Sequence, residues 1–118
     1  MKTYRGIRNR DGFLSAFVVT ETVGVPRAYP LQTGHEDVEV GHPGRGPDVL
    51  AVGILRDHFA GDEAKVAQYA EEFRVHYIEE IPQWLTRFEF TTAELDKMIE
   101  AIDERLGFEA KDQEELGW

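Results

Sequence analysis

The sequence EVGHPGRGPDVL, residues 39–50, joins a glycine-rich turn directly to an apolar helix. Gly44 and Gly46 give the backbone freedom to turn sharply. Pro47 suits the first position of a helix, where its missing N–H has no partner to lose. We therefore expect a tight connection between a sheet and a central helix that spans residues 47–59.

The chain before this turn is predicted to form strands. Aromatic and β-branched residues are frequent there, and Asp11-Gly12 is a strong hairpin signal. Pro30 confines its strand to an edge of the sheet, because proline donates no ladder hydrogen bond. The expected strands cover residues 2–8, 13–22, 27–31 and 36–40.

The chain after the turn is predicted to be mainly helical. Gly61 ends the central helix and Asp62 caps a second helix over residues 63–81, in which apolar residues recur at helical spacing. Pro82 stops that helix. Residues 84–90 alternate between apolar and polar, which indicates a short strand or an extended connector.

A third helix is expected from Thr91 onward. Thr91 and Glu94 fit the Ser/Thr-x-x-Glu capping box, and Gly107 is a natural helix terminator. The predicted domain therefore covers residues 1–108, followed by an acidic C-terminal tail over residues 109–118.

These elements predict an α+β fold, in which a small antiparallel sheet from the N-terminal third packs against three helices. The sheet's apolar face uses either Phe13 or Phe17 with Val19, or the alternate set of residues. Whichever set it is, we expect it to meet helix residues Leu50, Ile54, Phe73, Tyr77, Ile99 and Ile102.

The composition indicates a globular protein with room for one core. The 118 residues are 42% hydrophobic and 31% charged, which excludes a disordered chain. No apolar run is long enough to span a membrane and no signal segment stands at the start, so we expect a cytoplasmic protein. The absence of cysteine excludes disulfides and thiolate sites.

The net charge of −10 is distributed unevenly. Residues 1–33 hold five basic and two acidic groups, a balance of +3, and the remainder holds eight against 21, a balance of −13. A chain this acidic is repelled by nucleic acid and by anionic lipid, so we expect neither as a direct partner. A basic protein is the partner that the charge favours, and the oligomeric state stays open.

Several short motifs resemble an uncharacterised family of small bacterial and phage proteins, known as a domain of unknown function. The family similarly has a Tyr-Arg-Gly start, a glycine-rich turn ending in Gly-Pro, and an apolar helix ending near Asp-His. The matching residues here are Tyr4-Arg5-Gly6, Gly41 to Pro47 and Asp57-His58, with Phe73 and Ile81-Pro82 later. The resemblance implies a phage or mobile-element context and supplies no reaction.

The glycine-rich turn could bind a small anion or nucleotide, because backbone N–H groups at a helix start attract negative charge. Against this, Pro47 removes a donor and Asp48 adds a negative charge, and a phosphate-binding loop would have Lys followed by Ser or Thr. A tight turn would also explain the glycines. The candidate ligand-binding residues are His42, Gly44, Arg45 and Gly46.

Catalytic residues, metal ligands and cofactors are not predicted. His35, Asp37 and His42 lie close in sequence but match no recognised metal-binding spacing. Ser15 is the only serine and has no nucleophile motif around it. With 23 acidic residues, any pair of neighbouring carboxylates is expected by chance.

The third helix is predicted to carry an acidic surface, interrupted by Lys97 and Arg105. Such a surface can attract a basic partner. In a phage-like setting, an acidic protein of this kind could occupy the nucleic-acid groove of a host defence or transcription factor. The candidate partner-binding residues are Glu94, Glu100, Asp103 and Glu104, with Asp96 beside them.

Overall fold

The computed structural model describes residues 2–34 and 36–115, with side chains as far as residue 107. Its elements are β1 (Lys2–Arg8), β2 (Leu14–Thr22), β3 (Val25–Pro30), α1 (Arg45–His58), α2 (Glu63–Phe73), the π-helix η1 (Arg74–Ile78), β4 (Arg87–Thr91) and α3 (Thr92–Glu115). The predicted α+β class is confirmed.

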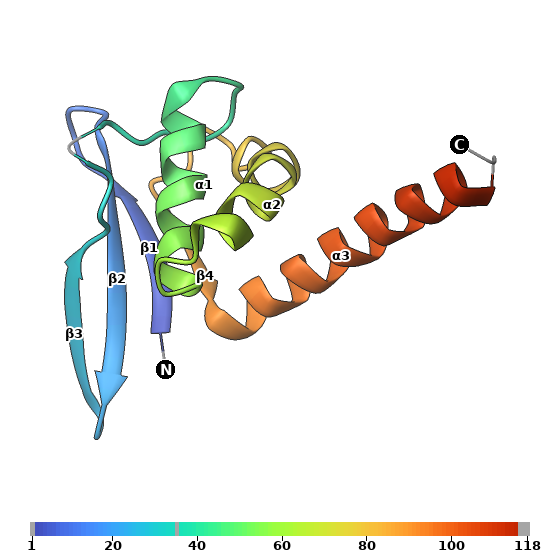
Figure 1. Cartoon of the computed structure of the whole chain (residues 1–118). Helices are drawn as coiled ribbons and strands as arrows, with labels where there is room; N and C mark the ends of the chain where they lie inside the picture. The colour runs from blue at the N-terminus through green and yellow to red at the C-terminus, as the bar shows by residue number, and fades with distance from the viewer. Residues whose placement is uncertain (1, 35, 116–118) are drawn as a thin grey trace.

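The strands form one sheet in the order β3-β2-β1-β4, and every neighbouring pair is antiparallel. β1 lies in the middle, with Tyr4 opposite Val18 of β2 and Phe90 of β4. The three α-helices lie on one side of this sheet, and α3 extends away from the body of the molecule (Figure 1). The sheet therefore has one buried face, and no described helix covers the other.

The buried face uses the alternate set of residues rather than Phe13 or Phe17 with Val19. Phe17 and Val19 pair with Arg5 and Thr3 on the face away from the helices. Gly6 is required on the inner face, because a Cβ there would lie 2.2 Å from the ring of Phe88. The inner face is formed by Tyr4, Gly6, Ala16, Val18, Phe88 and Phe90.

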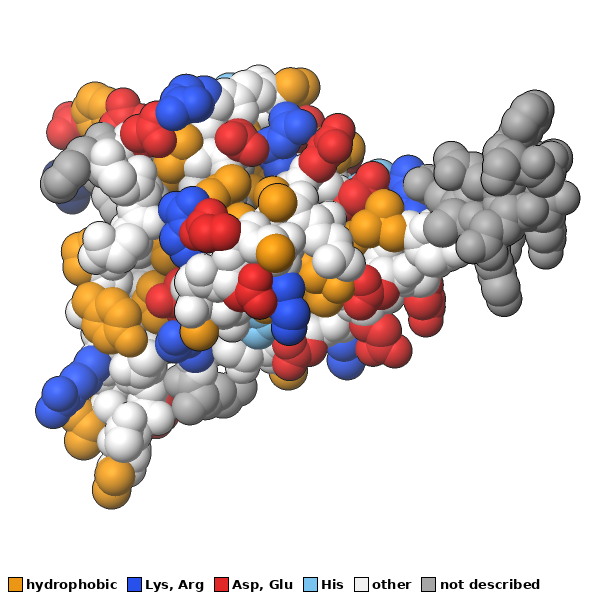
Figure 2. Space-filling model, viewed as in Figure 1, with side chains coloured by type: hydrophobic (Ala, Val, Ile, Leu, Met, Phe, Trp, Pro, Cys, Tyr) orange, Lys and Arg blue, Asp and Glu red, His pale blue; other side chains and the backbone are white. Residues whose placement is uncertain are grey.

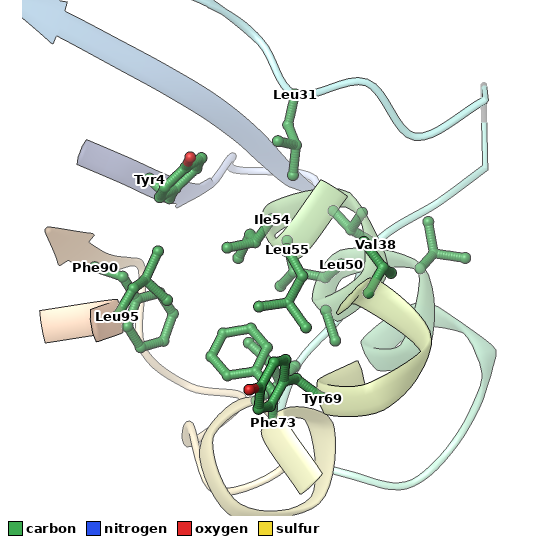
Figure 3. Close-up of a cluster of buried hydrophobic side chains, with 14 of the residues drawn as sticks. Tyr4, Leu31, Val38, Leu50, Ile54, Leu55, Tyr69, Phe73, Phe90 and Leu95 are labelled. Atoms are coloured by element: carbon green, nitrogen blue, oxygen red, sulfur yellow. The ribbon is translucent and has the colours of Figure 1, made fainter. Parts of the chain in front are cut away.

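The core is centred on α1, whose apolar side chains lie between the sheet and the other helices (Figure 3). Each large apolar side chain that is fully buried contributes about 1.5–3 kcal/mol to folding. Of the predicted helix residues, Tyr77 and Ile99 are only partly buried at the edge of this cluster. The others, Leu50, Ile54, Phe73 and Ile102, are buried as predicted.

The helix α1 begins at Arg45, two residues before the predicted start. Gly44 is its N-cap with φ +147°, and the Asp48 N–H bonds to the Gly44 carbonyl at 3.3 Å. Pro47 is thus the third helical residue. It is tolerated there because the first four N–H groups of a helix have no partner within the helix.

Residues 36–40 do not form the predicted fourth strand, and that prediction is wrong. Val38 and Val40 are buried, as they would be in a strand, but the segment pairs with no described strand. β4 occupies the free edge of β1 instead, with Phe88 and Phe90 over the inner face. Residues 84–90, for which the sequence indicates a short strand or an extended connector, contain most of this fourth strand.

The helix caps follow the sequence closely. Gly61 follows α1 with φ +84°, and Asp62 Oδ1 accepts a hydrogen bond from the Lys65 N–H at 3.2 Å at the start of α2. The predicted helix over residues 63–81 is α-helical only to Phe73 and then becomes η1. The wider turn lets the Glu79 N–H reach the Arg74 carbonyl at 2.9 Å.

The capping box of α3 is confirmed. Thr91 Oγ1 accepts from the Glu94 N–H at 3.1 Å, and Glu94 Oε1 accepts from the Thr91 N–H at 3.3 Å. Gly107 does not end the helix as predicted, because α3 continues to Glu115. Glycine permits a helix to end but does not require it. The predicted tail, residues 109–118, is thus part of α3 as far as Glu115, and residues 116–118 lie outside the described residues.

None of the helices among the described residues is both long and apolar enough to cross a membrane.

Candidate functional site

The glycine-rich turn lies at the N-terminal end of α1, and packing explains much of its sequence. A Cβ on Gly41 would lie 2.7 Å from the Ile81 carbonyl oxygen, so the close approach of the later connector requires glycine. A Cβ on Gly46 would lie 2.6 Å from the Cβ of Glu39. Nδ1 of His42 lies 2.7 Å from the Pro43 carbonyl oxygen.

Carboxylates surround the predicted anion site. The Arg45 side chain is 75% exposed, and its Nε donates to Glu36 Oε1 at 2.7 Å. Glu39 lies against Gly46 and Asp48 lies in the first turn of α1. An anion would have to displace Glu36 and approach the other carboxylates, so the local charge opposes it. Anion binding at His42, Gly44, Arg45 and Gly46 stays a prediction without added support.

The Arg8–Glu39 pair fastens this turn to β1. Two Arg8 nitrogens donate to the Glu39 carboxylate at 2.5 and 3.1 Å, and the Val40 N–H donates to it at 3.0 Å. These hydrogen bonds, above all those from Arg8, hold the pKa of Glu39 below its ordinary value. The same pairing raises the pKa of Arg8. Since the Arg8 side chain is only 14% exposed, the pair contributes to structure rather than to a free binding surface.

The acidic residues of α3 form a continuous row on one side of the helix, which we call the α3 acidic face. Side chains three and four residues apart are neighbours on a helix surface, and this spacing links all four members. All four are exposed, and acidic side chains gather along this part of α3 in Figure 2. The α3 acidic face consists of Asp96, Glu100, Asp103 and Glu104.

Two members of the α3 acidic face also bond to neighbouring helices. His58 Nε2 lies 3.0 Å from Asp96 Oδ1, and the Tyr69 hydroxyl donates to Asp103 Oδ1 at 2.6 Å. The hydrogen bond to Asp103 raises the pKa of Tyr69. Glu100 and Glu104 have no hydrogen-bond or ion-pair partner among the residues whose side chains are described.

Glu94, the remaining partner-binding candidate, lies apart from this face. It precedes Glu100 by six residues, which places it about 120° away around the helix axis. Its carboxylate also serves the capping box with Thr91. The structure therefore brings together Glu100, Asp103 and Glu104, adds Asp96 to them, and separates Glu94.

An open hollow of about 740 Å³ lies beside the start of β2. One wall consists of residues 12–15 in the β1–β2 hairpin, where the Phe13 side chain is 66% exposed. The other consists of residues 36–39 with Arg45 and Gly46. No local pattern in the sequence predicts this hollow, because long-range contacts bring its two walls together.

Histidines and carboxylates do not form a metal site in the part of the chain that is described. No group of three or more such side chains there could hold a metal ion. His58 and His76 bond instead to groups on α2 and α3, with His76 Nε2 at 3.1 Å from Glu72 Oε2. His35, which belonged to the cluster considered in the sequence, lies outside the described residues.

Comparisons with protein-family models, with curated proteins and with solved structures found no match. The resemblance to a family of small bacterial and phage proteins therefore stays a prediction. The candidate surfaces rest on geometry and charge.

Proposed function

We propose that this protein acts in the cytoplasm as a small acidic interaction protein of phage or mobile-element type, which binds a basic surface of a partner protein. The α3 acidic face is the binding surface, and Glu94 lies apart from it. The observation that carries the proposal is the row of exposed carboxylates on this face.

The density of charge on this face suits a nucleic-acid groove. From Asp96 to Glu104 the helix rises about 12 Å, which gives one carboxylate per roughly 3–4 Å. Each strand of a duplex carries one phosphate per about 3.4 Å of the duplex axis. A protein groove that binds a nucleic-acid strand therefore meets a similar line of negative charge on α3.

Charge repulsion within the row works against the helix. Asp96, Glu100 and Glu104 follow one another at intervals of four residues, and each like-charged pair at this spacing destabilises a helix by about 0.2–0.5 kcal/mol. Glu100 and Glu104 gain no described partner in return. A basic partner would relieve this repulsion, which supports binding as the role of the row.

The test compares two double variants with equal changes of charge. Glu100→Gln with Glu104→Gln removes two charges from the α3 acidic face, and Glu71→Gln with Glu80→Gln removes two exposed charges elsewhere. Each form is used as bait in the native host, and the dissociation constant of the captured partner is then measured. We expect the first pair to weaken binding by about tenfold or more and the second to change it little.

Two further measurements connect this binding to nucleic acid. The captured partner should release its nucleic acid when the acidic protein is added, and the affinity should fall as salt rises because exposed charges are screened. Equal binding by both double variants, or a partner that holds protein and nucleic acid simultaneously, would refute the proposal.

A further inference from the structure

The start of β2 has a neighbouring strand on one side only. The whole of β1 pairs with residues Leu14 to Thr20 of β2. β3 pairs with β2 only from Phe17 to Thr22, and its last contact is the Leu31 N–H bonded to the Ala16 carbonyl at 2.9 Å. The chain then leaves the sheet, so the first residues of β2 form an open strand edge.

The hydrogen-bonding groups of Leu14 point toward this open edge. The Arg8 N–H donates to the Thr86 carbonyl on the β4 side at 2.9 Å, so it points away from β2. Arg8 and Leu14 lie opposite each other and are therefore a pair that exchanges no hydrogen bonds. Leu14 therefore directs its N–H and carbonyl away from β1. The Ala16 N–H points the same way, and none of these three groups has a backbone partner among the described residues.

The outer edge of β3, by contrast, is protected against pairing. The backbone hydrogen-bonding groups of Val25, Arg27 and Tyr29 point toward β2. Those of Pro26, Ala28 and Pro30 therefore point outward. Two of these three positions have no N–H to donate, a common protection of edge strands. The sheet thus blocks pairing along β3 and leaves it available at Leu14 and at the Ala16 N–H.

The open hollow of about 740 Å³ lies against this free edge. Residues 36–39 line its opposite wall without joining the sheet, so space remains where another strand would lie. Phe13, two-thirds exposed, offers an apolar surface in the hairpin wall.

The charge of the hollow favours a basic occupant. Three carboxylates line it, from Glu36, Asp37 and Glu39, against one arginine, Arg45. Glu36 and Glu39 already pair with Arg45 and Arg8, whereas Asp37 is exposed and has no partner among the described side chains. A cationic side chain of an incoming segment would find its counter-charge there.

We propose that the edge of β2 at Leu14 and Ala16, with the adjoining hollow, is a docking slot for an extended basic peptide segment of a partner protein. The segment adds to the sheet as a strand by bonding the Leu14 N–H and carbonyl and the Ala16 N–H. Its alternate side chains contact Phe13 and Asp37. This slot is separate from the α3 acidic face and does not require that face to bind anything.

The first experiment titrates the full chain with a synthetic peptide of alternating lysine and valine, and follows it by NMR and amide hydrogen exchange. We expect exchange of the Leu14 and Ala16 amides to slow by about tenfold at saturation. The Ser15 amide, which faces β1, should change little and provides an internal control. A peptide with alternate backbone nitrogens methylated has the same charge but lacks donors and should bind much more weakly.

Matched variants test the charge. Asp37→Lys should weaken binding of the lysine peptide several-fold. Glu71→Lys, which changes the net charge equally but lies on α2, should have little effect on this binding. A peptide of alternating glutamate and valine should not bind. The Glu100→Gln and Glu104→Gln protein should bind the lysine peptide at the slot as before, so this result is independent of the α3 acidic face.

Three outcomes would overturn the slot. One is that the methylated peptide binds as tightly as the unmethylated one. Another is that the NMR shifts caused by the peptide are confined to α3, which would indicate charge attraction alone. The third is concentration-dependent protection of Leu14 and Ala16 without peptide, which would identify a second copy of the chain as the occupant.

Discussion

Tyr4 donates its phenolic hydrogen bond to Asp57 Oδ2 at 2.6 Å and so connects the middle of β1 to the last turn of α1. Lys2 Nζ lies 3.0 Å from the same oxygen. The contact joins two of the motifs on which the family resemblance rests, the Tyr-Arg-Gly start and the Asp-His helix end.

The rest of the Tyr-Arg-Gly start has a structural role as well. Arg5 Nε donates to Glu89 Oε1 at 2.9 Å on the outer face of the sheet, and Gly6 provides the space for the Phe88 ring. Each of the three residues therefore holds β1 to another element. These motifs specify the fold and do not by themselves indicate a reaction.

The first prediction concerns the Tyr4 hydroxyl. Tyr4→Phe should lower the free energy of unfolding by about 1 kcal/mol, because Asp57 keeps Lys2 and water as partners when the hydrogen bond is lost. Urea unfolding at neutral pH measures the change. Tyr29→Phe, on the exposed edge strand, is the control and should change stability by less than about 0.5 kcal/mol. A Tyr4 variant as stable as the wild type would contradict the contact.

The same residue predicts a loss of stability at alkaline pH. Burial, followed by the hydrogen bond to Asp57, raises the pKa of Tyr4 well above its ordinary value of 10.0. Above pH 10 the unfolded chain ionises this group while the folded chain keeps its proton, so the free energy of unfolding falls as pH rises. Tyr4→Phe should show a shallower decline above pH 10, and an unchanged slope would refute the assignment.

Glu39 predicts the opposite pH dependence. Its pKa is held below the ordinary value of 4.5, mainly by Arg8, so its contribution is present above pH 4.5 and is lost as pH falls through the folded-state pKa. Glu39→Gln should reduce stability at neutral pH by about 1–3 kcal/mol, because it leaves the largely buried Arg8 without its counter-charge. The free energy of unfolding of this variant should also fall less steeply as pH is lowered below 4.5.

The control for this prediction is Glu36→Gln. Glu36 and Arg45 form an exposed ion pair, which is worth less than about 1 kcal/mol. Chemical unfolding across the acidic range distinguishes the two variants. Equal losses for both would mean that the Arg8 pair has no special role.

Local signals in the sequence predicted much of the fold. The bounds of β1, the capping box at Thr91 and the cap at Asp62 depend on neighbouring residues, and all three are confirmed. The pairing of β4 with β1 was not predictable in this way, because it depends on Phe88 fitting over Gly6 from 82 positions away. Residues 36–40 had strand character but pair with no strand of the sheet.

The two candidate surfaces differ in the same way, because one follows from local sequence signals and the other does not. The exposed carboxylates of α3 follow from helical spacing and were predicted, although the separation of Glu94 from Glu100 needed the helix geometry. The slot beside β2 was missed because it depends on where β3 ends and where residues 36–39 pass. Neither the end of β3 nor the path of residues 36–39 follows from a local sequence pattern.

Two helical glycines should respond in opposite ways to alanine. Gly46→Ala places a Cβ 2.6 Å from the Glu39 side chain and 3.1 Å from its backbone nitrogen, so α1 or the preceding turn must shift. We expect a loss of about 1–3 kcal/mol. Gly107→Ala meets no atom of the described residues within 4 Å and should stabilise the protein by about 0.5–1 kcal/mol through helix propensity. Thermal unfolding measures both, and a stabilising Gly46→Ala would contradict the close packing of the turn.

Val23 stores strain at the tip of the β2–β3 hairpin. It has φ +54° and is followed by Gly24 at φ +77°, a two-residue turn in which a β-branched residue is disfavoured. Since its side chain is 96% exposed, no buried contact offsets a cost of roughly 1 kcal/mol. Val23→Asn should therefore raise the free energy of unfolding by about 1 kcal/mol and the melting temperature by about 3–5 °C. Val25→Asn, within the adjoining strand, should give no gain because asparagine is disfavoured in strands. If Val23→Asn left the melting temperature unchanged, the turn would not hold the strain that its backbone indicates.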